Sequence, residues 1–301
     1  MAKARALDRR RKSVRNIRKI TRTMELIATA RFKKAMDRSI AARDYTTSLT
    51  RILENIAKAG GAVVHPLLDV RPTSRTAVLV LTGNRGLCGG YNSNVVRQAM
   101  AIVGQWRSER VDTHVSVSGK RGISALRFRG VDLAERYTTF EDKPEFAAVV
   151  PIGRAYLEAY ASGAIDRLDV VYTRFHSIAR QEAVTEMLLP LTAPQPAATG
   201  LPAKGAVPVR AELASDAYDF YPSPESILEE ILPASFLSRL FKCFLDAAVS
   251  EQVARMVAMK AATENAGGLI KSLSRQYNRA RQSQITGEIM EILGGVEALK
   301  Q

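Results

Sequence analysis

The sequence is poor in cysteine, histidine and long apolar runs, and each shortage argues against a class of protein. Only two of its 301 residues are cysteine and three are histidine, so neither a disulfide framework nor a Cys/His zinc site is expected. No apolar run approaches the roughly 18 residues that a membrane-spanning helix needs. The N-terminus also lacks the apolar segment of a secretion signal. We therefore expect a protein of a reducing compartment that does not cross a membrane.

Proline and glycine are missing from long stretches at both ends of the chain. Neither occurs between residues 3 and 59, and no proline follows Pro233. Because both residues interrupt helices, their absence predicts one long helix over 1–60, and the lack of proline after Pro233 predicts another over 223–301. A helix of about 55 residues would be roughly 80 Å long, which exceeds the width of a compact domain.

Both predicted helices carry narrow stripes of small and apolar residues. One seven-residue series comprises Val14, Thr21, Ala28, Ala35, Ala42, Leu49 and Ile56. A second comprises Ile17, Met24, Arg31, Arg38, Tyr45, Ile52 and Ala59. In the C-terminal helix, a third series has residues spaced alternately three and four apart: Val249, Gln252, Met256, Met259, Thr263, Ala266, Ile270, Leu273, Tyr277 and Ala280. These seams predict that the two helices pair as an antiparallel coiled coil. The open alternative is two separate amphipathic helices on a globular core.

The middle of the chain alternates between β-branched segments and helical segments. Strands are predicted at Ala77–Thr82, Thr113–Ser118, Val131–Thr138 and Leu168–Arg174, with Val184–Leu189 as a candidate last strand. Helices are predicted at Asn94–Val103, Arg121–Arg129 and Glu145–Ala161. This order is typical of an α/β layer with a mostly parallel sheet, here over 72–190. A Pro-, Ala- and Gly-rich loop is expected at Gln195–Ala217, within the linker 191–222.

Positive charge is concentrated near the N-terminus. The whole chain has 44 Lys and Arg against 30 Asp and Glu. Residues 1–43 alone contain fifteen Lys and Arg against three acidic residues. Such a basic segment is typical of contact with nucleic acid, an anionic membrane or an acidic protein surface.

A glycine-rich stretch, "TGNRGLCGGYN" over Thr82–Asn92, follows the first predicted strand and precedes a helix. Glycines at such a turn can bring backbone N–H groups around a phosphate. The spacing nevertheless matches neither the Walker loop nor the dinucleotide fingerprint. A tight turn or an interaction surface is therefore favoured, and anion binding remains the open alternative.

No catalytic, cofactor-binding or metal-binding constellation is evident. His65, His114 and His176 are isolated from one another, and Cys88 is expected to be a small buried residue. Glu288 and Glu291 lie three apart on one helical face, where solvation or salt bridges explain them best. We therefore predict no catalytic residue, no cofactor and no metal.

Four stretches resemble the gamma subunit of F-type ATP synthase. "IRKITRTMELIATARFKKA" (Ile17–Ala35) is similar to the family's N-terminal helix, and "TGNRGLCGGYN" to its glycine loop. "SEQVARMVAMKAATENAGGLIKSLSRQYNRARQSQIT" (Ser250–Thr286) and "ITGEIMEILGG" (Ile285–Gly295) resemble its C-terminal helix and terminal signature. The resemblance covers the whole chain. It implies an α/β-plus-α fold, in which an antiparallel coiled coil of the terminal helices stands on a Rossmann-like α/β domain.

The resemblance also implies a function and partners. The chain would be the central rotor stalk, a non-catalytic subunit that couples ion-driven rotation of the c-ring to ATP synthesis or hydrolysis. Its partners would be the alpha and beta subunits, the epsilon subunit and the c-ring, with no nucleic acid. It would be peripheral, at the cytoplasmic face of the bacterial inner membrane.

Three groups of contact residues follow from the resemblance and from the end of the last helix. Rotor contacts to the catalytic ring are expected at Met24, Arg281, Gln282, Thr286 and Glu288. An apolar bearing is expected at Ile285, Ile289, Ile292, Val296 and Leu299. A tight base turn is expected at Gly86, Leu87, Cys88, Gly89 and Gly90, where a Cβ on Gly89 or Gly90 would clash or force an unfavourable φ.

The resemblance is not complete, and a second function class is the open alternative. Gly83–Asn84 replaces the family's usual Ser–Asp, which removes a carboxylate from the loop. The alternative function is a basic coiled coil that binds nucleic acid through Arg9, Arg10, Arg11, Lys12 and Arg15. Aromatic residues for base stacking are scarce in this segment, which disfavours single-strand binding.

Overall fold

Two long helices occupy the ends of the sequence. The computed structural model describes residues 2–58, 65–140, 143–191 and 224–298, and it contains α1 (Ala2–Lys58) and α5 (Pro224–Ala298). Both terminal helices were expected, and both are confirmed. The chain divides into two compact units, Met1–Thr29 with Arg255–Gln301, and Ala30–Ala254. Each long helix contributes to both units.

The first unit consists of the beginning of α1 and the end of α5, whose side chains meet. The Thr263 hydroxyl donates a hydrogen bond to the Thr21 hydroxyl at 2.8 Å. The Arg11 guanidinium lies 4.7 Å from the centre of the Tyr277 ring. Residue numbers thus rise along α1 as they fall along α5 in these pairs.

The two seven-residue series in α1 differ in burial. Thr21, Ala28 and Ala35 are at most 8% exposed, whereas Ile17 and Tyr45 are more than half exposed. The second series is therefore the more exposed of the two. Small residues allow two helix backbones to approach closely. A second buried series of apolar residues on α1 is then not needed for packing.

The second unit is built around a five-stranded mixed sheet. Its strands are β1 (Arg75–Leu81), β2 (Asp112–Ser118), β3 (Glu135–Tyr137), β4 (Arg167–Phe175) and β5 (Gln181–Leu189). The order is β3-β2-β1-β4-β5. The first four strands are parallel, and β5 returns antiparallel to β4. The mostly parallel α/β sheet is confirmed, including its last strand.

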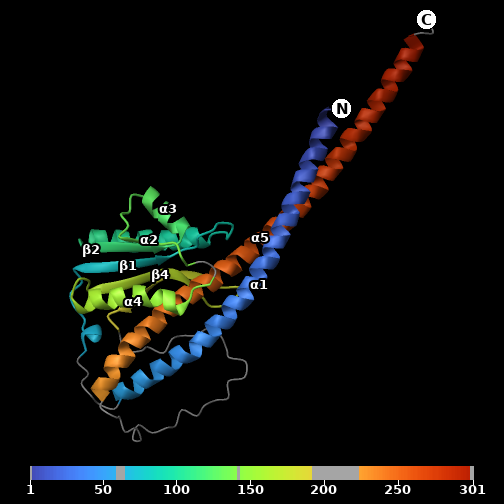
Figure 1. The fold of residues 1–301 in the computed structure, drawn as a ribbon. Helices are drawn as coiled ribbons and strands as arrows, with labels where there is room; N and C mark the ends of the chain where they lie inside the picture. Colours follow the sequence, from blue (N-terminus) through green and yellow to red (C-terminus); the bar gives the residue numbers. More distant parts are fainter. Residues whose placement is uncertain (1, 59–64, 141–142, 192–223, 299–301) are drawn as a thin grey trace. The chain divides into compact units, whose positions relative to one another are not determined.

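Helices cover both faces of this sheet, as Figure 1 shows. On one face, α2 (Tyr91–Ser108) and α3 (Lys120–Phe128) bury Val95, Trp106 and Leu126 against β1 and β2. On the other face, α4 (Phe146–Ala161) and α5 bury Val149 and Phe236 against the same sheet. A short 3-10 helix, η1 (Pro66–Leu68), precedes β1 and adds Leu67 to this second core.

Two segments differ from the sequence-based expectation or lie outside the described residues. Val131–Thr138 was predicted as a strand, but only Glu135–Tyr137 pairs with β2. The predicted loop Gln195–Ala217 and almost all of the linker 191–222 lie outside the described residues.

The long helix α5 contains Pro233 within its first turns. A proline inside a helix removes one hydrogen bond and costs about 3 kcal/mol. Here the neighbouring Leu232, Phe236 and Leu240 are at most 3% exposed in the core shared with the sheet. Their burial offsets the lost bond, so the helix continues through the proline.

Candidate functional site

The glycine-rich loop between β1 and α2 has a left-handed backbone at two positions. Leu87 has φ +62° and Gly89 has φ +55°. A side chain at Gly89 would therefore be strained, as expected. Gly90 has φ −84°, and a methyl group there would meet only Asn94, at 3.5 Å. The expectation of a clash was thus wrong for Gly90, which begins α2 with ordinary backbone geometry.

The side chains of this turn point to different environments. Leu87 is 60% exposed, whereas Cys88 is buried. The Cys88 sulfur accepts a hydrogen bond from Asn92 Nδ2 at 3.1 Å. Gly86 lies close to α3, because a Cβ there would be 3.3 Å from Arg121 Nη2. The turn therefore presents one apolar side chain to solvent on a constrained backbone.

Asn84 fixes the loop to two neighbouring segments. Its Oδ1 accepts a hydrogen bond from the Lys120 backbone N–H at 3.0 Å. Its Nδ2 donates to the carbonyl oxygens of Thr138 and Phe140, at 3.0 and 2.9 Å. An aspartate could accept the first bond but could not donate the other two. An amide at this position is thus explained by its partners.

The carboxyl ends of β1 and β4 are covered by α5. The strand order reverses between β1 and β4. In open α/β sheets, ligands usually bind at the carboxyl ends of the strands beside such a reversal. Here the Tyr91 hydroxyl donates to the Ala247 carbonyl at 3.1 Å, and Ser250 Oγ donates to the Thr173 carbonyl at 3.2 Å. The Glu251 side chain lies against Gly83, where an added Cβ would be 2.7 Å from Glu251 Oε1. The Glu251 side chain of α5 thus lies against the start of the glycine-rich loop.

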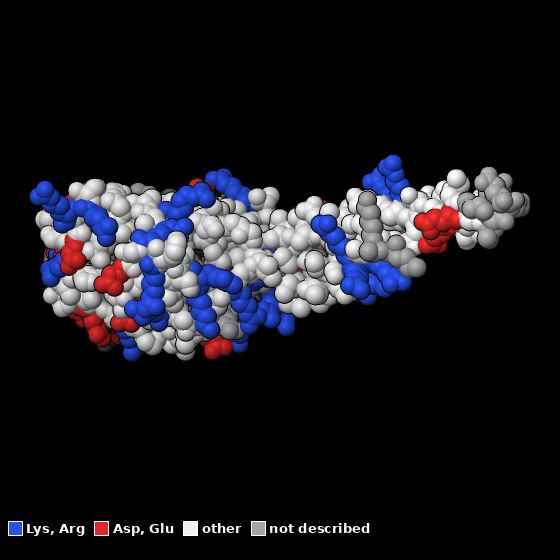
Figure 2. Space-filling model, turned by 90° about the horizontal axis from the view of Figure 1, so that it is seen from above, with Lys and Arg blue, Asp and Glu red and all other residues white. Residues whose placement is uncertain are grey.

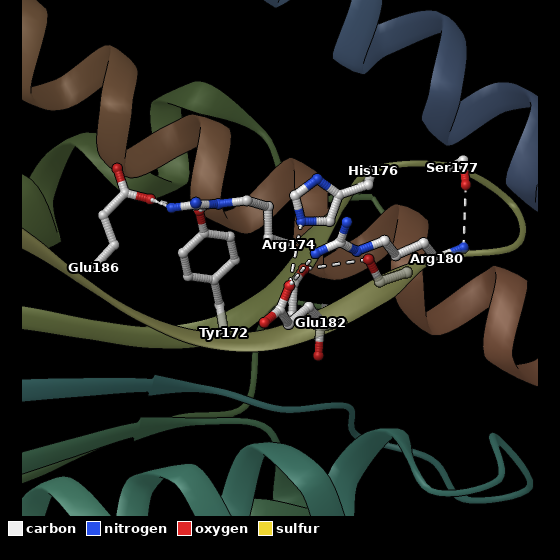
Figure 3. Close-up of polar contacts among 9 residues, drawn as sticks. Tyr172, Arg174, His176, Ser177, Arg180, Glu182 and Glu186 are labelled. Carbon is white, nitrogen blue, oxygen red and sulfur yellow. Dashed lines mark hydrogen bonds and ion pairs between the residues drawn. The ribbon is translucent and has the colours of Figure 1, made fainter. Parts of the chain in front are cut away.

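A second contact region joins the β4–β5 hairpin to α5 and is shown in Figure 3. Glu186 Oε2 accepts hydrogen bonds from the Tyr172 hydroxyl at 2.6 Å and from Arg174 Nη2 at 2.7 Å. On the α5 side, Arg239 Nη2 lies 3.5 Å from Glu186 Oε1. Burial alone would raise the pKa of Glu186, but the bonds from Tyr172 and Arg174 outweigh it and lower the pKa.

Asp246 lies on α5 beside this network and is 6% exposed. Burial raises the pKa of its carboxyl group to about 7, with a further upward contribution from Glu186. The cations Lys242 and Arg174 act in the opposite direction but do not cancel the burial. Asp246 was not singled out from the sequence, because a single aspartate in a helix carries no signal of its burial.

The three histidines have separate and unremarkable partners. His65 Nδ1 accepts a hydrogen bond from the Leu67 backbone N–H at 3.1 Å. His114 lies 3.5 Å from Asp112, and His176 lies 3.7 Å from Glu182. Within the described residues, no three His, Cys, Asp or Glu side chains are grouped so as to hold a metal ion.

The predicted rotor contacts lie mainly on exposed helix surface. Arg281, Gln282, Thr286 and Glu288 are exposed on α5, and Met24 is partly buried on α1. Of the predicted apolar bearing, Ile285, Ile289 and Ile292 are 47%, 51% and 67% exposed. The Val296 side chain and Leu299 lie outside what the structure describes. An exposed isoleucine stripe at the end of a helix is a candidate contact surface for another protein.

Basic side chains are dispersed over the molecular surface, as Figure 2 shows for one face. Two of the five residues proposed for phosphate contact are engaged within the chain. Arg11 and Lys12 both pair with Asp8, at 2.6 and 3.1 Å. None of the helices in the described part of the chain has both the length and the apolarity that a membrane crossing requires.

Comparison with known proteins identifies the family. A family model described as ATP synthase matches residues 3–299. The ATP synthase gamma chain of Rhodopirellula baltica is 57% identical over the full length of both chains. That of Frankia casuarinae is 40% identical and covers 97% of this chain and 96% of its own. These relatives give no support to the nucleic-acid alternative.

Solved structures agree at the level of the fold. The rotor of the Euglena gracilis mitochondrial ATP synthase matches with a TM-score of 0.61 and 19% identity, covering 94% of this chain and 99% of its own. The central stalk and c-ring structure from Tetrahymena thermophila contains a chain that matches with a TM-score of 0.59 and 19% identity, covering 81% and 99%. Together with the sequence matches over the whole length, these findings show that the chain belongs to the ATP synthase gamma chain family.

Proposed function

We propose that this chain is the central rotor stalk of an ATP synthase. It turns inside a ring of alternating alpha and beta subunits and couples rotation of the c-ring to ATP synthesis or hydrolysis. The observation that carries this proposal is the 57% identity to a gamma chain over the full length of both proteins.

The stalk itself is an antiparallel coiled coil of the two terminal helices. The contacts of Arg11 with Tyr277 and of Thr21 with Thr263 support this arrangement. The base is a Rossmann-like domain over 72–190, a description that the strand order β3-β2-β1-β4-β5 supports. The shaft helices span 1–60 and 223–301, and 191–222 links the base to the second of them.

The chain has no catalytic site of its own, and it binds neither nucleotide nor cofactor. The position of α5 over the carboxyl ends of β1 and β4 supports this proposal, because the Glu251 side chain lies against Gly83 at the start of the loop. Catalysis belongs to the surrounding ring. The stalk acts on it by making different contacts with different conformations of the ring subunits.

Polar residues near the end of α5 make those contacts. Arg281, Gln282, Thr286 and Glu288 are exposed, and an arginine can form a two-pronged bond with a carboxylate on a passing loop. Met24 on α1 adds an apolar contact. The exposed stripe of Ile285, Ile289 and Ile292, continued by Val296 and Leu299, turns as an apolar bearing in the collar of the ring.

The base contacts the epsilon subunit and the c-ring. Its turn at Gly86, Leu87, Cys88, Gly89 and Gly90 lies at or near that surface, and the exposed Leu87 supports this role. The chain is thereby peripheral to the membrane, held by protein contacts at the cytoplasmic face of a bacterial inner membrane.

Reconstitution tests the proposed function. Alpha and beta subunits from the same organism are mixed with or without this chain, and steady-state ATP hydrolysis is measured. The complex with the chain is expected to hydrolyse ATP continuously, whereas the chain alone shows no hydrolysis. A chain that co-purifies with neither subunit, and leaves their activity unchanged, would contradict the proposal.

A further inference from the structure

The glycine-rich stretch Thr82–Asn92 and strand β4 contact α5 at three adjacent positions. The Tyr91 hydroxyl binds the Ala247 carbonyl, and Ser250 Oγ binds the Thr173 carbonyl. The third contact is the Glu251 side chain, which fills the space in front of Gly83. Ala247 and Glu251 are one helical turn apart, so both face the β1–α2 loop.

These contacts differ in kind from the apolar packing around them. Apolar contact is non-directional, so it opposes separation of two surfaces more than it opposes their rotation or sliding. Hydrogen bonds weaken steeply when donor and acceptor lose alignment. The Glu251 side chain lies next to the Gly83 backbone, which obstructs its sideways movement. The three contacts therefore resist rotation of α5 about its own axis.

The loop that holds α5 is itself firmly fixed. The Gly83 N–H donates to Asn92 Oδ1 at 2.9 Å, and Asn84 makes three hydrogen bonds to neighbouring segments. The left-handed backbone at Leu87 and Gly89 further restricts its conformations. A loop that is restrained in this way can transmit force instead of yielding to it.

We infer that the β1–α2 loop is a torque clamp on α5, with Glu251 as the side chain that it holds. The inference rests on the proposed function, because a clamp has a purpose only if the base and the shaft must turn together. Glu251 acts as a positioning residue, and Gly83 provides the space for it. The glycine-rich sequence thus serves to seat a carboxylate of the same chain instead of a phosphate.

The test is a double-mutant cycle in the complete membrane-bound complex. Gly83→Ala removes the space for Glu251, and Glu251→Ala removes the side chain that occupies it. The obstacle at Gly83 is the end of a flexible side chain, and its φ lies outside the strained positive region. Gly83→Ala should therefore displace the carboxylate without preventing folding. Gly104→Ala on α2 is the matched control, since a Cβ there meets nothing within 4 Å.

The measured quantity is the ratio of ATP-driven membrane potential to ATP hydrolysis in inverted vesicles, read with a potential-sensitive dye. Gly83→Ala and Glu251→Ala should each lower this ratio by about twofold or more, while hydrolysis persists. The double variant should equal Glu251→Ala, because Gly83 acts only through Glu251. Gly104→Ala should match the unmodified complex.

Two results would overturn the clamp. One is an unchanged ratio in both single variants, and the other is a double variant whose loss is the sum of the two single losses. Assembly is monitored by the hydrolysis rate of each complex and by the thermal midpoint of each purified chain. A failure of the proposed function is distinguishable, because the unmodified chain would then fail to support pumping at all.

Discussion

The hydroxyl groups of Thr263 and Thr21 meet at 2.8 Å between the two terminal helices. Thr21 is 8% exposed and belongs to the seven-residue series that also buries Ala28. A buried hydrogen bond between small residues sets the relative register of two helices more specifically than apolar contact does.

Thr21→Val should destabilise the chain, because the replacement keeps the shape but leaves the Thr263 hydroxyl without this partner. The expected loss in the free energy of unfolding is about 1 kcal/mol. Thr23→Val on the same helix is the control, since Thr23 is exposed and bonds only within its own helix. Urea denaturation of the purified chain measures both. Equal effects of the two substitutions would contradict the assigned role.

Asn84→Asp should weaken the base. The substitution removes the two bonds donated to Thr138 and Phe140 and leaves both carbonyls without that donor. The expected cost is about 1–3 kcal/mol. Asn94→Asp is the control, because Asn94 is exposed and its Oδ1 only accepts from Arg97. A thermal midpoint that shifts no more for Asn84→Asp than for Asn94→Asp would refute the prediction.

Asp246 should make stability depend on pH. Its pKa is raised by burial to about 7 in the folded chain, against a reference value of 3.8. The folded state therefore binds the proton more tightly than the unfolded state does, and this contribution to stability declines as pH rises between these two values. The stabilising contribution is fully present below pH 3.8 and is lost above about pH 7.

Asp246→Asn should remove this dependence. The variant should match the unmodified chain near the acidic end of that range and be more stable than it at pH 8, as measured by urea denaturation across pH. Glu230→Gln is the control, because Glu230 lies exposed on the same helix. A variant that is less stable at pH 8 would show that ionised Asp246 has stabilising partners.

Arg281→Ala should lower ATP turnover and assembly of the complex while the isolated chain stays folded. Its side chain is exposed on α5, so its removal has little consequence for the fold. The measurements are steady-state hydrolysis by the reconstituted complex and the thermal midpoint of the free chain. Arg275→Ala, exposed on the same helix, serves as the control. Unchanged turnover in Arg281→Ala would refute this contact.

The terminal helices and the sheet could be predicted because their signals are local. A long stretch without proline and glycine predicted α1, the lack of proline after Pro233 with a three-and-four apolar spacing predicted α5, and β-branched runs predicted β1, β2 and β4. The strand over Val131–Thr138 was predicted too long. Its alternating Val131 and Leu133 imitate a strand, yet both are buried against α2 and α3 without strand pairing to β2.

The contacts of α5 with the loop could not be predicted, because they join residues far apart in the sequence. Gly83 and Glu251 show no common pattern, and the gap that one provides for the other exists only in the fold. The seam of α1 was ambiguous for a related reason. Two series at the same spacing are equivalent in sequence, and only the packing of Ala28 distinguishes them.

Rotation of the base within the working complex is the most direct test of the proposed role as a rotor stalk. Ser124→Cys on the exposed surface of α3 provides a single reactive attachment point, because Cys88 and Cys243 are both buried. A bead is bound there, the alpha–beta ring is fixed to glass, and ATP is added. The bead is expected to rotate continuously in one direction and to stop when ATP is removed. A complex that hydrolyses ATP while the bead remains stationary would contradict that role.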